Sequence, residues 1–255
     1  MKYIRYRYQG TTSYGILDGQ IVREIKGGLF GDRAETGSTA GVDQVELLWP
    51  CEPSKILAVG LNYRSHLKSH APGREAPANP EIFYKPSSAL LASGGRIRIP
   101  RDARDVHYEG ELAVVIGKTI REATAAEAED AVFGCTCGND VSERYWQKND
   151  LQWWRAKGCD TFAPLGPVLV TGFDWRQGRV ETRLNGSVVQ AGAFNELMFN
   201  PPEIIRFASQ YATLYPGDVI YTGTPGSTGT LKAGDLVEVE IPGIGILHNT
   251  VVRAW

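Results

Sequence analysis

The stretch from Val106 to Lys118 constrains the fold of this chain more than any other part of the sequence. Its second half, Leu112 to Ile116, is apolar and rich in β-branched side chains, which predicts a buried strand. Glu109 and Glu111 stand at the entrance of that strand. Because side chains alternate along a strand, we expect both carboxylates on the same face of the sheet. The predicted strand therefore joins a buried apolar run to a pair of acids at one end.

Two neighbouring carboxylates raise each other's pKa unless a cation compensates their charge. A hard divalent ion such as Mg²⁺, Mn²⁺ or Ca²⁺ prefers oxygen ligands and would supply that charge. Asp140 follows a second apolar segment, Phe133–Cys137, and would bring a third oxygen ligand from a neighbouring strand. The alternatives are two solvated glutamates at a sheet edge and, for Asp140, the N-cap of a helix that starts near Ser142.

The composition is that of an ordinary globular protein. Of the 255 residues, 42% are hydrophobic and 22% are charged, and the formal net charge is -2. This balance gives no reason to expect nucleic acid or an anionic membrane as a partner. No apolar run approaches the roughly 20 residues that span a bilayer. The first residues alternate apolar and basic side chains without an apolar signal core, so we expect a cytoplasmic protein.

The four cysteines do not form a recognisable zinc motif. Cys135 and Cys137 are separated by one residue, which is closer than the C-x₂-C spacing of a zinc site, and no second pair has a matching spacing. We expect free structural thiols, because a reducing cytosol disfavours disulfides.

The length suits a small domain at residues 1–53 followed by a larger one at residues 54–255. In the small domain, strands are predicted at Tyr3–Gln9 and Tyr14–Glu24 with turns at Gly10 and Asp18-Gly19, and the stretch Gly27–Asp43 is predicted to be a loop. The elements predicted in the large domain are a strand at Lys55–Leu61, helices at Glu122–Val132, Val141–Leu151 and Pro201–Tyr211, a turn at Pro164–Pro167 and a hairpin around Asn185-Gly186. Residues 67–80 are rich in proline and are predicted to form a mobile loop or short lid.

Two further features carry candidate ligand-binding groups. Lys157 lies among aromatic residues, and a buried lysine needs an anion. A substrate carboxylate or enolate is one candidate for that anion; the alternatives are Asp160 or a position at the surface. The Gly- and Thr-rich loop 222–229 follows a predicted strand but lacks the G-K-[ST] of a phosphate loop. Its backbone N–H groups and hydroxyls suit a small carboxylate; the alternative is an ordinary tight turn.

Seven motifs follow one another along the chain: G-L-N-Y-R-S-H (60–66), F-Y-K-P (83–86), H-Y-E-G-E-L (107–112), G-N-D-V-S-E-R (138–144), A-K-G-x-D-T-F-x-P-L-G-P (156–167), P-G-D-V-I-Y-T-G-T-P (216–225) and V-E-V-E-I-x-G-I-G-x-L-x-N (237–249). With these motifs in this order, residues 54–252 resemble the fumarylacetoacetate hydrolase (FAH) superfamily. The first 50 residues resemble the small domain that precedes the catalytic domain in many bacterial members.

The resemblance implies an α+β, β-rich fold. In this fold a mixed β-sheet is rolled into a barrel-like sandwich, here with a small N-terminal domain, and the chain usually forms a homodimer. The resemblance also implies that Glu109, Glu111 and Asp140 hold Mg²⁺ or Mn²⁺. The substrates it implies are 2-oxo acids, often diketo acids or their enols.

Roles for individual residues follow from the same resemblance. His66 matches a general base, and Lys157 and Thr224 match groups that hold the remaining substrate oxygens. The other substrate-binding candidates are Tyr63, Arg64, Gln147 and Gly223. A Lewis acid makes a 2-oxo acid a good electron sink, and the resulting enolate can arise by C–C hydrolysis, decarboxylation or proton transfer.

The sequence departs from the family pattern at Ser69. Many hydrolytic members carry a glutamate at this position, one helical turn after the histidine, where it orients that histidine. Glu75, in the segment that follows, is a candidate substitute that would act when the segment closes. The absence of the glutamate weakens the expectation of efficient C–C hydrolysis.

Three functions follow as hypotheses. The first is a hydrolase that splits an acylpyruvate or fumarylpyruvate type of substrate into pyruvate and a carboxylic acid. The second is an isomerase or decarboxylase, of the 2-hydroxyhepta-2,4-diene-1,7-dioate isomerase or oxaloacetate decarboxylase/tautomerase type, and Ser69 favours it. The third is a binding protein that keeps the metal site without turnover, which the complete set of candidate site residues disfavours.

Overall fold

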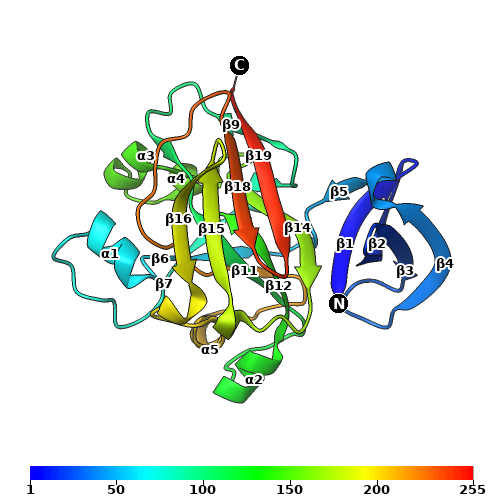
Figure 1. Ribbon diagram of the computed structural model, residues 1–255. Helices are drawn as coiled ribbons and strands as arrows, with labels where there is room; N and C mark the ends of the chain where they lie inside the picture. Colours follow the sequence, from blue (N-terminus) through cyan, green and yellow to red (C-terminus); the bar gives the residue numbers. More distant parts are fainter. Residues whose placement is uncertain (255) are drawn as a thin grey trace.

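The computed structural model describes residues 1–254 and is built mainly of β-strands (Figure 1). The largest sheet has the strand order β4 (Ala34–Gly41), β3 (Ile21–Lys26), β2 (Thr11–Asp18), β1 (Lys2–Tyr8), β14 (Ala163–Val170), β12 (Val132–Asn139), β11 (Gly110–Ile116), β17 (Val219–Tyr221), β6 (Ile56–Gly60) and β7 (Glu81–Lys85). Two short strands join it, β5 (Glu46–Leu48) beside β1 and β8 (Leu90–Leu91) beside β14.

A second sheet lies against the large one. Its strand order is β16 (Ser187–Ala193), β15 (Arg179–Leu184), β18 (Leu236–Ile241), β19 (Gly245–Arg253) and β9 (Arg96–Ile99). A two-stranded ladder joins β10 (Val106–His107) to β13 (Ser142–Glu143). The α-helices are α1 (Arg64–His70), α2 (Ala125–Asp130), α3 (Arg144–Asn149), α4 (Trp154–Gly158) and α5 (Pro201–Tyr211). The β-rich, sandwich-like fold is confirmed, although within residues 1–254 the sheets do not close into a barrel.

Strand β11 lies at the centre of the core and is buried along its whole length. Leu112, Val114 and Ile116 pack in one apolar cluster with side chains of the second sheet and of α5. Ala113 and Val115 belong to a different cluster on the opposite face of the large sheet. The continuous apolar run of this strand therefore serves two cores at once, as expected for a strand covered on both faces.

Truncation of Leu112 tests how much this packing contributes to the stability of the protein. Its side chain is completely buried, so Leu112→Ala leaves a cavity that its neighbours can fill only in part. We expect the free energy of unfolding to fall by about 2–5 kcal/mol, measured as a shift of the urea midpoint at unchanged slope. A loss of well under 1 kcal/mol would mean that the core around β11 collapses freely onto the vacated space.

The N-terminal strands extend the large sheet. Strand β1 pairs with β14 through Lys2↔Val170 and Tyr3↔Leu169, so the N-terminal strands, at one side of Figure 1, continue the sheet of the rest of the chain. The predicted loop at Gly27–Asp43 is wrong, because β4 occupies 34–41 and pairs with β3. Most of β4 is exposed, and an edge strand needs backbone hydrogen bonds rather than apolar side chains.

Two other predictions need correction. Pro164–Pro167 is not a turn but part of β14, where Leu165 and Gly166 still pair with β12. The predicted helix at 141–151 is shorter, because 142–143 form β13 and α3 begins at Arg144. Its N-cap is Glu143, whose carboxylate accepts a hydrogen bond from Trp146 N at 2.5 Å, so the N-cap alternative for Asp140 is wrong.

Several local predictions are confirmed. Helix α5 has the predicted bounds, and α2 begins with the predicted capping box of Thr124 and Glu127. Asn185 and Gly186 form the tight hairpin turn between β15 and β16, with φ of 52° and 82°. The four cysteines are free thiols. No described helix has both the length and the apolar character that a membrane span requires.

Candidate active site and metal centre

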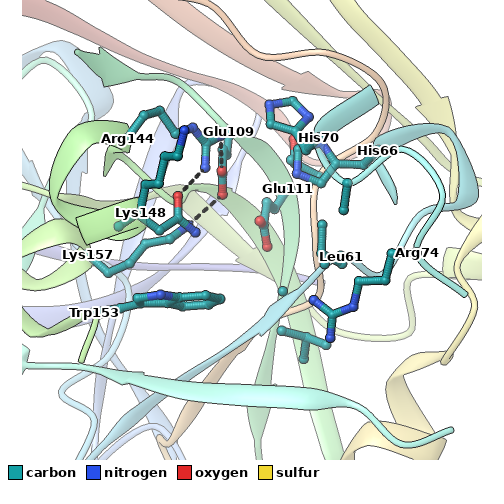
Figure 2. Close-up of a pocket in the computed structure, with 15 residues that line it drawn as sticks. Leu61, His66, His70, Arg74, Glu109, Glu111, Arg144, Lys148, Trp153 and Lys157 are labelled. Carbon is teal, nitrogen blue, oxygen red and sulfur yellow. Dashed lines mark hydrogen bonds and ion pairs between the residues drawn. The ribbon is translucent and has the colours of Figure 1, made fainter. Parts of the chain in front are cut away.

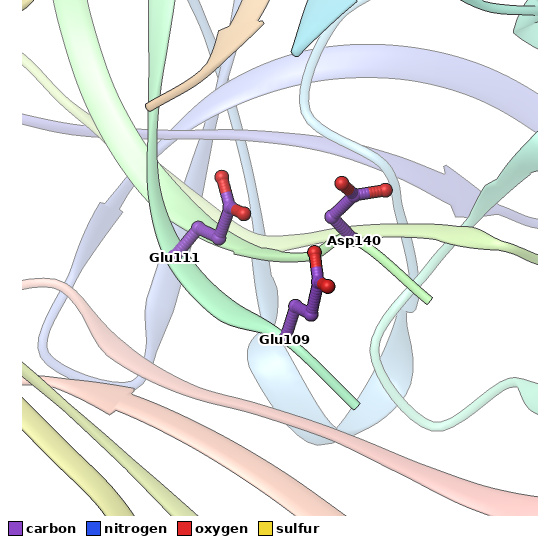
Figure 3. A group of neighbouring side chains, drawn as sticks. All are labelled: Glu109, Glu111 and Asp140. Carbon is purple, nitrogen blue, oxygen red and sulfur yellow. The ribbon is translucent and has the colours of Figure 1, made fainter. Parts of the chain in front are cut away.

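The antiparallel pairing of β11 and β12 gathers three carboxylates at one end of the sheet. The register Gly110↔Asn139 places the start of β11 beside the end of β12. Glu109 and Glu111 therefore lie close to Asp140, as Figure 3 shows. One oxygen from each carboxylate lies within 4.8 Å of the others, and all three residues are buried. The clustering predicted for these acids is thus what the structure shows.

Three buried or half-buried cations surround two of these carboxylates. Lys157 Nζ donates to Glu109 Oε2 at 2.8 Å and to Asp140 Oδ2 at 2.6 Å. Lys85 donates to Asp140, and Arg144 donates to Glu109. Burial alone would raise the pKa of Glu109, but Arg144 and Lys157 hold that pKa well below its usual value. Burial would lower the pKa of Lys157, but Asp140 and Glu109 outweigh it and raise that pKa.

Glu111 differs from the other two acids in having no cation partner among residues 1–254. Its carboxylate accepts a hydrogen bond from Gly223 N at 2.6 Å. Burial, followed by the charges of Asp140 and Glu109, raises the pKa of Glu111 well above its usual value. Gly223 has a φ of 105°, and a Cβ there would lie 2.7 Å from Asn62 Cβ, so the close approach to Glu111 requires glycine.

This donor set suits a divalent metal ion. Three clustered carboxylates supply hard oxygen ligands, and one of them still lacks a positive partner. A further cation at this place would favour the ionised form of Glu111 and remove the repulsion that raises its pKa. The observation that points to the ion is therefore the missing charge beside Glu111.

A cavity of about 450 Å³ opens beside the two glutamates (Figure 2). It is lined by groups from α1, α3, α4 and the loop after β17, among them His66, His70, Arg144, Gln147, Lys157 and Thr224. Its size is in the range of small-molecule sites. Arg74, Lys148 and Trp153 also line it, and all three are labelled in Figure 2.

His66 is the buried imidazole of this cavity. Its Nδ1 lies 2.8 Å from Gly226 O. A carbonyl oxygen only accepts, so Nδ1 carries the proton and Nε2 keeps its lone pair. Burial lowers the pKa of His66, which keeps the ring neutral at pH 7. Within residues 1–254, no carboxylate forms a hydrogen bond or ion pair with this ring.

The structure brings half of the predicted catalytic and substrate-binding residues together in the cavity. His66, Lys157, Gln147 and Thr224 all line the cavity. Gln147 Oε1 accepts a hydrogen bond from Arg144 at 2.7 Å. The hydroxyl of Thr224 already donates to Gly110 O at 2.9 Å, so it fixes the start of β11. The alternatives for Lys157, Asp160 or the surface, are wrong, because Lys157 is 3% exposed and its anions are Glu109 and Asp140. Its contact with a substrate carboxylate or enolate stays a prediction.

Four predicted catalytic or substrate-binding residues do not line this cavity: Tyr63, Arg64, Glu75 and Gly223, whose backbone N donates to Glu111 instead. Arg64 is exposed on α1, and Glu75 is exposed in the segment between α1 and β7. The structure does not bring Glu75 into hydrogen-bond or ion-pair contact with His66. Tyr63 is fully buried, and its hydroxyl has no hydrogen-bond partner within residues 1–254. Burial, together with Glu111 and Glu196, raises the pKa of Tyr63.

Sequence reasoning missed Lys85 and Arg144 as parts of the site. Both stand in motifs that were recognised, F-Y-K-P and G-N-D-V-S-E-R. The available signal was electrostatic, because buried carboxylates require cations. That signal does not say which of the 27 Lys and Arg residues supplies them.

Comparison with known proteins adds independent findings. Residues 55–252 match the family described as "Fumarylacetoacetate (FAA) hydrolase C-terminal" and residues 1–50 match "Rv2993c-like, N-terminal". Protein Rv2993c of Mycobacterium tuberculosis is 41% identical over 251 residues, which cover 94% of each chain. The mitochondrial oxaloacetate tautomerase Fahd2a of Rattus norvegicus is 40% identical over 82% of this chain and 70% of its own length.

Solved structures show the same fold. A 5-carboxymethyl-2-hydroxymuconate delta-isomerase from Mycobacterium smegmatis has a TM-score of 0.93 at 40% identity, with 100% of both chains covered. A maleylpyruvate hydrolase from Sphingobium sp. SYK-6, in complex with manganese(II) and pyruvate, has a TM-score of 0.82 at 27% identity, again with 100% of both chains covered. Relatives of this chain therefore include isomerases, a tautomerase and hydrolases.

Proposed function

This chain belongs to the fumarylacetoacetate hydrolase family of enzymes, and on that premise we propose that it catalyses proton transfer on a 2-oxo acid. The reaction is a keto–enol tautomerisation or double-bond isomerisation that depends on a divalent metal. The observation that carries the proposal is the state of His66: it is a neutral imidazole in the cavity, its Nε2 keeps a lone pair, and no carboxylate of residues 1–254 pairs with it.

Glu109, Glu111 and Asp140 would hold the metal ion, Mg²⁺ or Mn²⁺. When bound, the ion supplies Lewis-acid polarisation of the 2-oxo acid, which makes the neighbouring carbon acidic. Lys157 and Arg144 keep Glu109 ionised and add positive charge to the cavity wall, where a substrate carboxylate would lie. The buried surroundings strengthen both effects, because little water screens the charges.

His66 is the base for the carbon-bound proton. Its protonated Nδ1 is held by Gly226 O, so the lone pair of Nε2 is available to remove the proton and the same nitrogen can return it. Hydrolysis of a C–C bond asks more of the site, because a water molecule must also be bound and activated beside the substrate. His66 takes up a proton in both reactions, and a carboxylate on Nδ1 would make it a stronger base by stabilising the imidazolium. Here Nδ1 contacts a backbone carbonyl instead, and the weaker base suits a carbon acid that the metal would already activate better than it suits water.

The test is a substrate panel followed by NMR in D₂O with Mn²⁺ or Mg²⁺ added. We expect rapid exchange of the C3 protons of oxaloacetate, without cleavage of acetylpyruvate or fumarylpyruvate. Because free metal ions also enolise oxaloacetate, metal without protein is the control. Formation of pyruvate and a free acid from the diketo compounds would assign the protein to the hydrolases. A metal-loaded protein that turns over none of these compounds would be a binding protein.

Glu75 provides a second discriminating experiment. It is exposed and does not contact His66, so we expect Glu75→Gln to leave the exchange rate unchanged. A loss of about 10²-fold or more, the size typical of a disabled general base, would restore Glu75 as a partner that reaches His66 when the segment closes.

We also propose that the working unit is a homodimer, in line with the family resemblance. Size-exclusion chromatography with light scattering decides this directly. A particle of about 28 kDa, the mass of one chain, would contradict it.

A further inference from the structure

We propose that His70 is a positioning residue that orients His66 for proton transfer. This inference rests on the proposed function, in which His66 is the base. His70 lies one helical turn after His66 on α1, and the two rings have centroids 4.0 Å apart with planes inclined by 31°. Figure 2 shows both imidazoles side by side at the wall of the cavity.

A single hydrogen bond does not fix an imidazole. The contact from Nδ1 of His66 to Gly226 O sets the direction of one nitrogen but does not by itself prevent the ring from tilting, and a large tilt would break this bond and remove the preference for a protonated Nδ1. The ring of His70 covers one face of His66 and limits this tilt. Since Nε2 must point at the carbon acid within narrow limits, the neighbouring ring contributes to the geometry of the reaction.

His70 is itself held at both of its nitrogens. Ser69 Oγ lies 2.9 Å from its Nδ1, and Thr228 Oγ1 lies 3.0 Å from its Nε2. Ser69 is the residue that replaces the glutamate expected from the family pattern. In this protein position 69 therefore carries a hydroxyl that contacts the imidazole of His70, where the family pattern has a carboxylate that orients the histidine itself.

The anchor at Thr228 belongs to a longer chain of hydrogen bonds. Thr228 Oγ1 lies 2.7 Å from His107 Nδ1 and accepts a hydrogen bond from Arg144 at 2.9 Å. His107 Nε2 lies 2.8 Å from Asp105 Oδ1. These contacts tie α1 to β10 and to the loop after β17, so the position of His70 is determined by elements on both sides of the cavity.

When His70 and His107 are both neutral, these hydrogen bonds have one consistent set of donors and acceptors. The Asp105 carboxylate accepts from His107 Nε2–H, so Nδ1 of His107 accepts the hydroxyl proton of Thr228. Thr228 Oγ1 then accepts from Nε2–H of His70. Nδ1 of His70 is left as an acceptor 2.9 Å from Ser69 Oγ, and it shares the single hydroxyl proton of Ser69 with the carbonyl oxygens of His66 and Gly226, each 3.0 Å away.

The charges that face His70 agree with this neutral state. His70 is partly exposed on α1, but its partial burial, followed by His66 and Arg144, lowers the pKa of His70 to about 4, while Glu109 acts in the opposite direction. A neutral ring against His66 adds no positive charge beside the base. His70 therefore packs against His66 without opposing its uptake of a proton.

The experiment compares His70→Ala, His70→Phe, Thr228→Val and Thr228→Ser. We expect His70→Ala to lower kcat by about 10²-fold, the cost of misplacing a reacting group, with a much smaller change in KM. His70→Phe keeps a ring against His66 and should recover part of kcat. Thr228→Val, which loses the anchor, should lower kcat, and Thr228→Ser should retain it. His248→Ala removes a histidine on β19, outside the cavity, and is the matched control.

A second readout does not depend on turnover. In protein labelled with ¹⁵N-histidine, the ring nitrogens of His66 should show a protonated Nδ1 and an unprotonated Nε2, and His70→Ala should mix the two tautomers. Mn²⁺ affinity should stay unchanged in every variant. A His70→Ala variant with wild-type kcat and an unchanged His66 tautomer would overturn the inference. Wild-type protein that exchanges no 2-oxo acid would instead overturn the proposed function and leave the tautomer test of His70 valid.

Discussion

Replacing Glu111 by glutamine is expected to abolish both divalent-metal binding and turnover. Within residues 1–254 Glu111 has no ion-pair partner, so it is the proposed ligand whose charge the ion would most directly neutralise. The amide keeps the size of the side chain and can still accept the hydrogen bond from Gly223 N. Loss of a residue that only supports a ligand costs about 10–100-fold in metal affinity, and loss of a ligand should exceed that.

The measurement is a titration with Mn²⁺, followed by electron paramagnetic resonance, for wild type and variant. Glu129→Gln is the matched control, since Glu129 forms an exposed pair with Arg176 away from the cavity. Thermal unfolding without metal should show that Glu111→Gln is folded, because the amide keeps the size of the side chain and removes no apolar contact. A variant that binds Mn²⁺ with wild-type affinity and remains active would remove Glu111 from the metal site.

Replacing His66 by alanine is expected to lower the rate of proton exchange by about 10²–10⁴-fold, the usual contribution of a general base. The metal site should be unaffected, because His66 forms no hydrogen bond with any of the three carboxylates. Measured together, lost exchange and unchanged Mn²⁺ affinity would separate the base from the metal ligands. His248→Ala again serves as the control.

Two results would contradict this assignment. If His66→Ala retained the exchange rate, another group in the cavity would be the base, and Lys157 would be the first to examine. If the variant lost Mn²⁺ affinity as well, His66 would support the metal site rather than move the proton. Because His66 is buried, the unfolding midpoint of the variant must be measured alongside.

The sequence alone was sufficient to predict the central strand of the fold and the three carboxylates of the site. Strand β11 could be predicted because an apolar, β-branched run is a local property of the chain. Glu109 and Glu111 could be placed on one face because alternation along a strand is equally local. Asp140 could be added because it ends the next apolar segment, which pairs with β11.

Other local features could also be predicted, because they are formed by residues that are close in the sequence. The capping box of α2, the proline at the start of α5 and the Asn185-Gly186 turn involve residues within one turn of each other. Predictions failed where the structure depends on distant partners. Strand β4 has a loop-like composition and forms because β3 lies beside it, and β14 continues through Pro164 and Pro167 because β12 pairs with it.

Only the tertiary structure decided which groups complete the site. Lys85 reaches Asp140 from 55 residues away, and Gly226 holds His66 from 160 residues away. The ring of His70 and the hydroxyl of Thr228 are likewise distant in the sequence, 158 residues apart, and form a hydrogen bond in the folded protein. Ion pairs and hydrogen bonds act over a few ångströms and carry no periodic pattern along the chain, so they appear only once the sheets are packed. The carboxylates, and the metal chemistry that they make possible, can therefore be predicted from the sequence. The lysine and arginine partners of these carboxylates, and the contacts that hold His66, are determined by the fold.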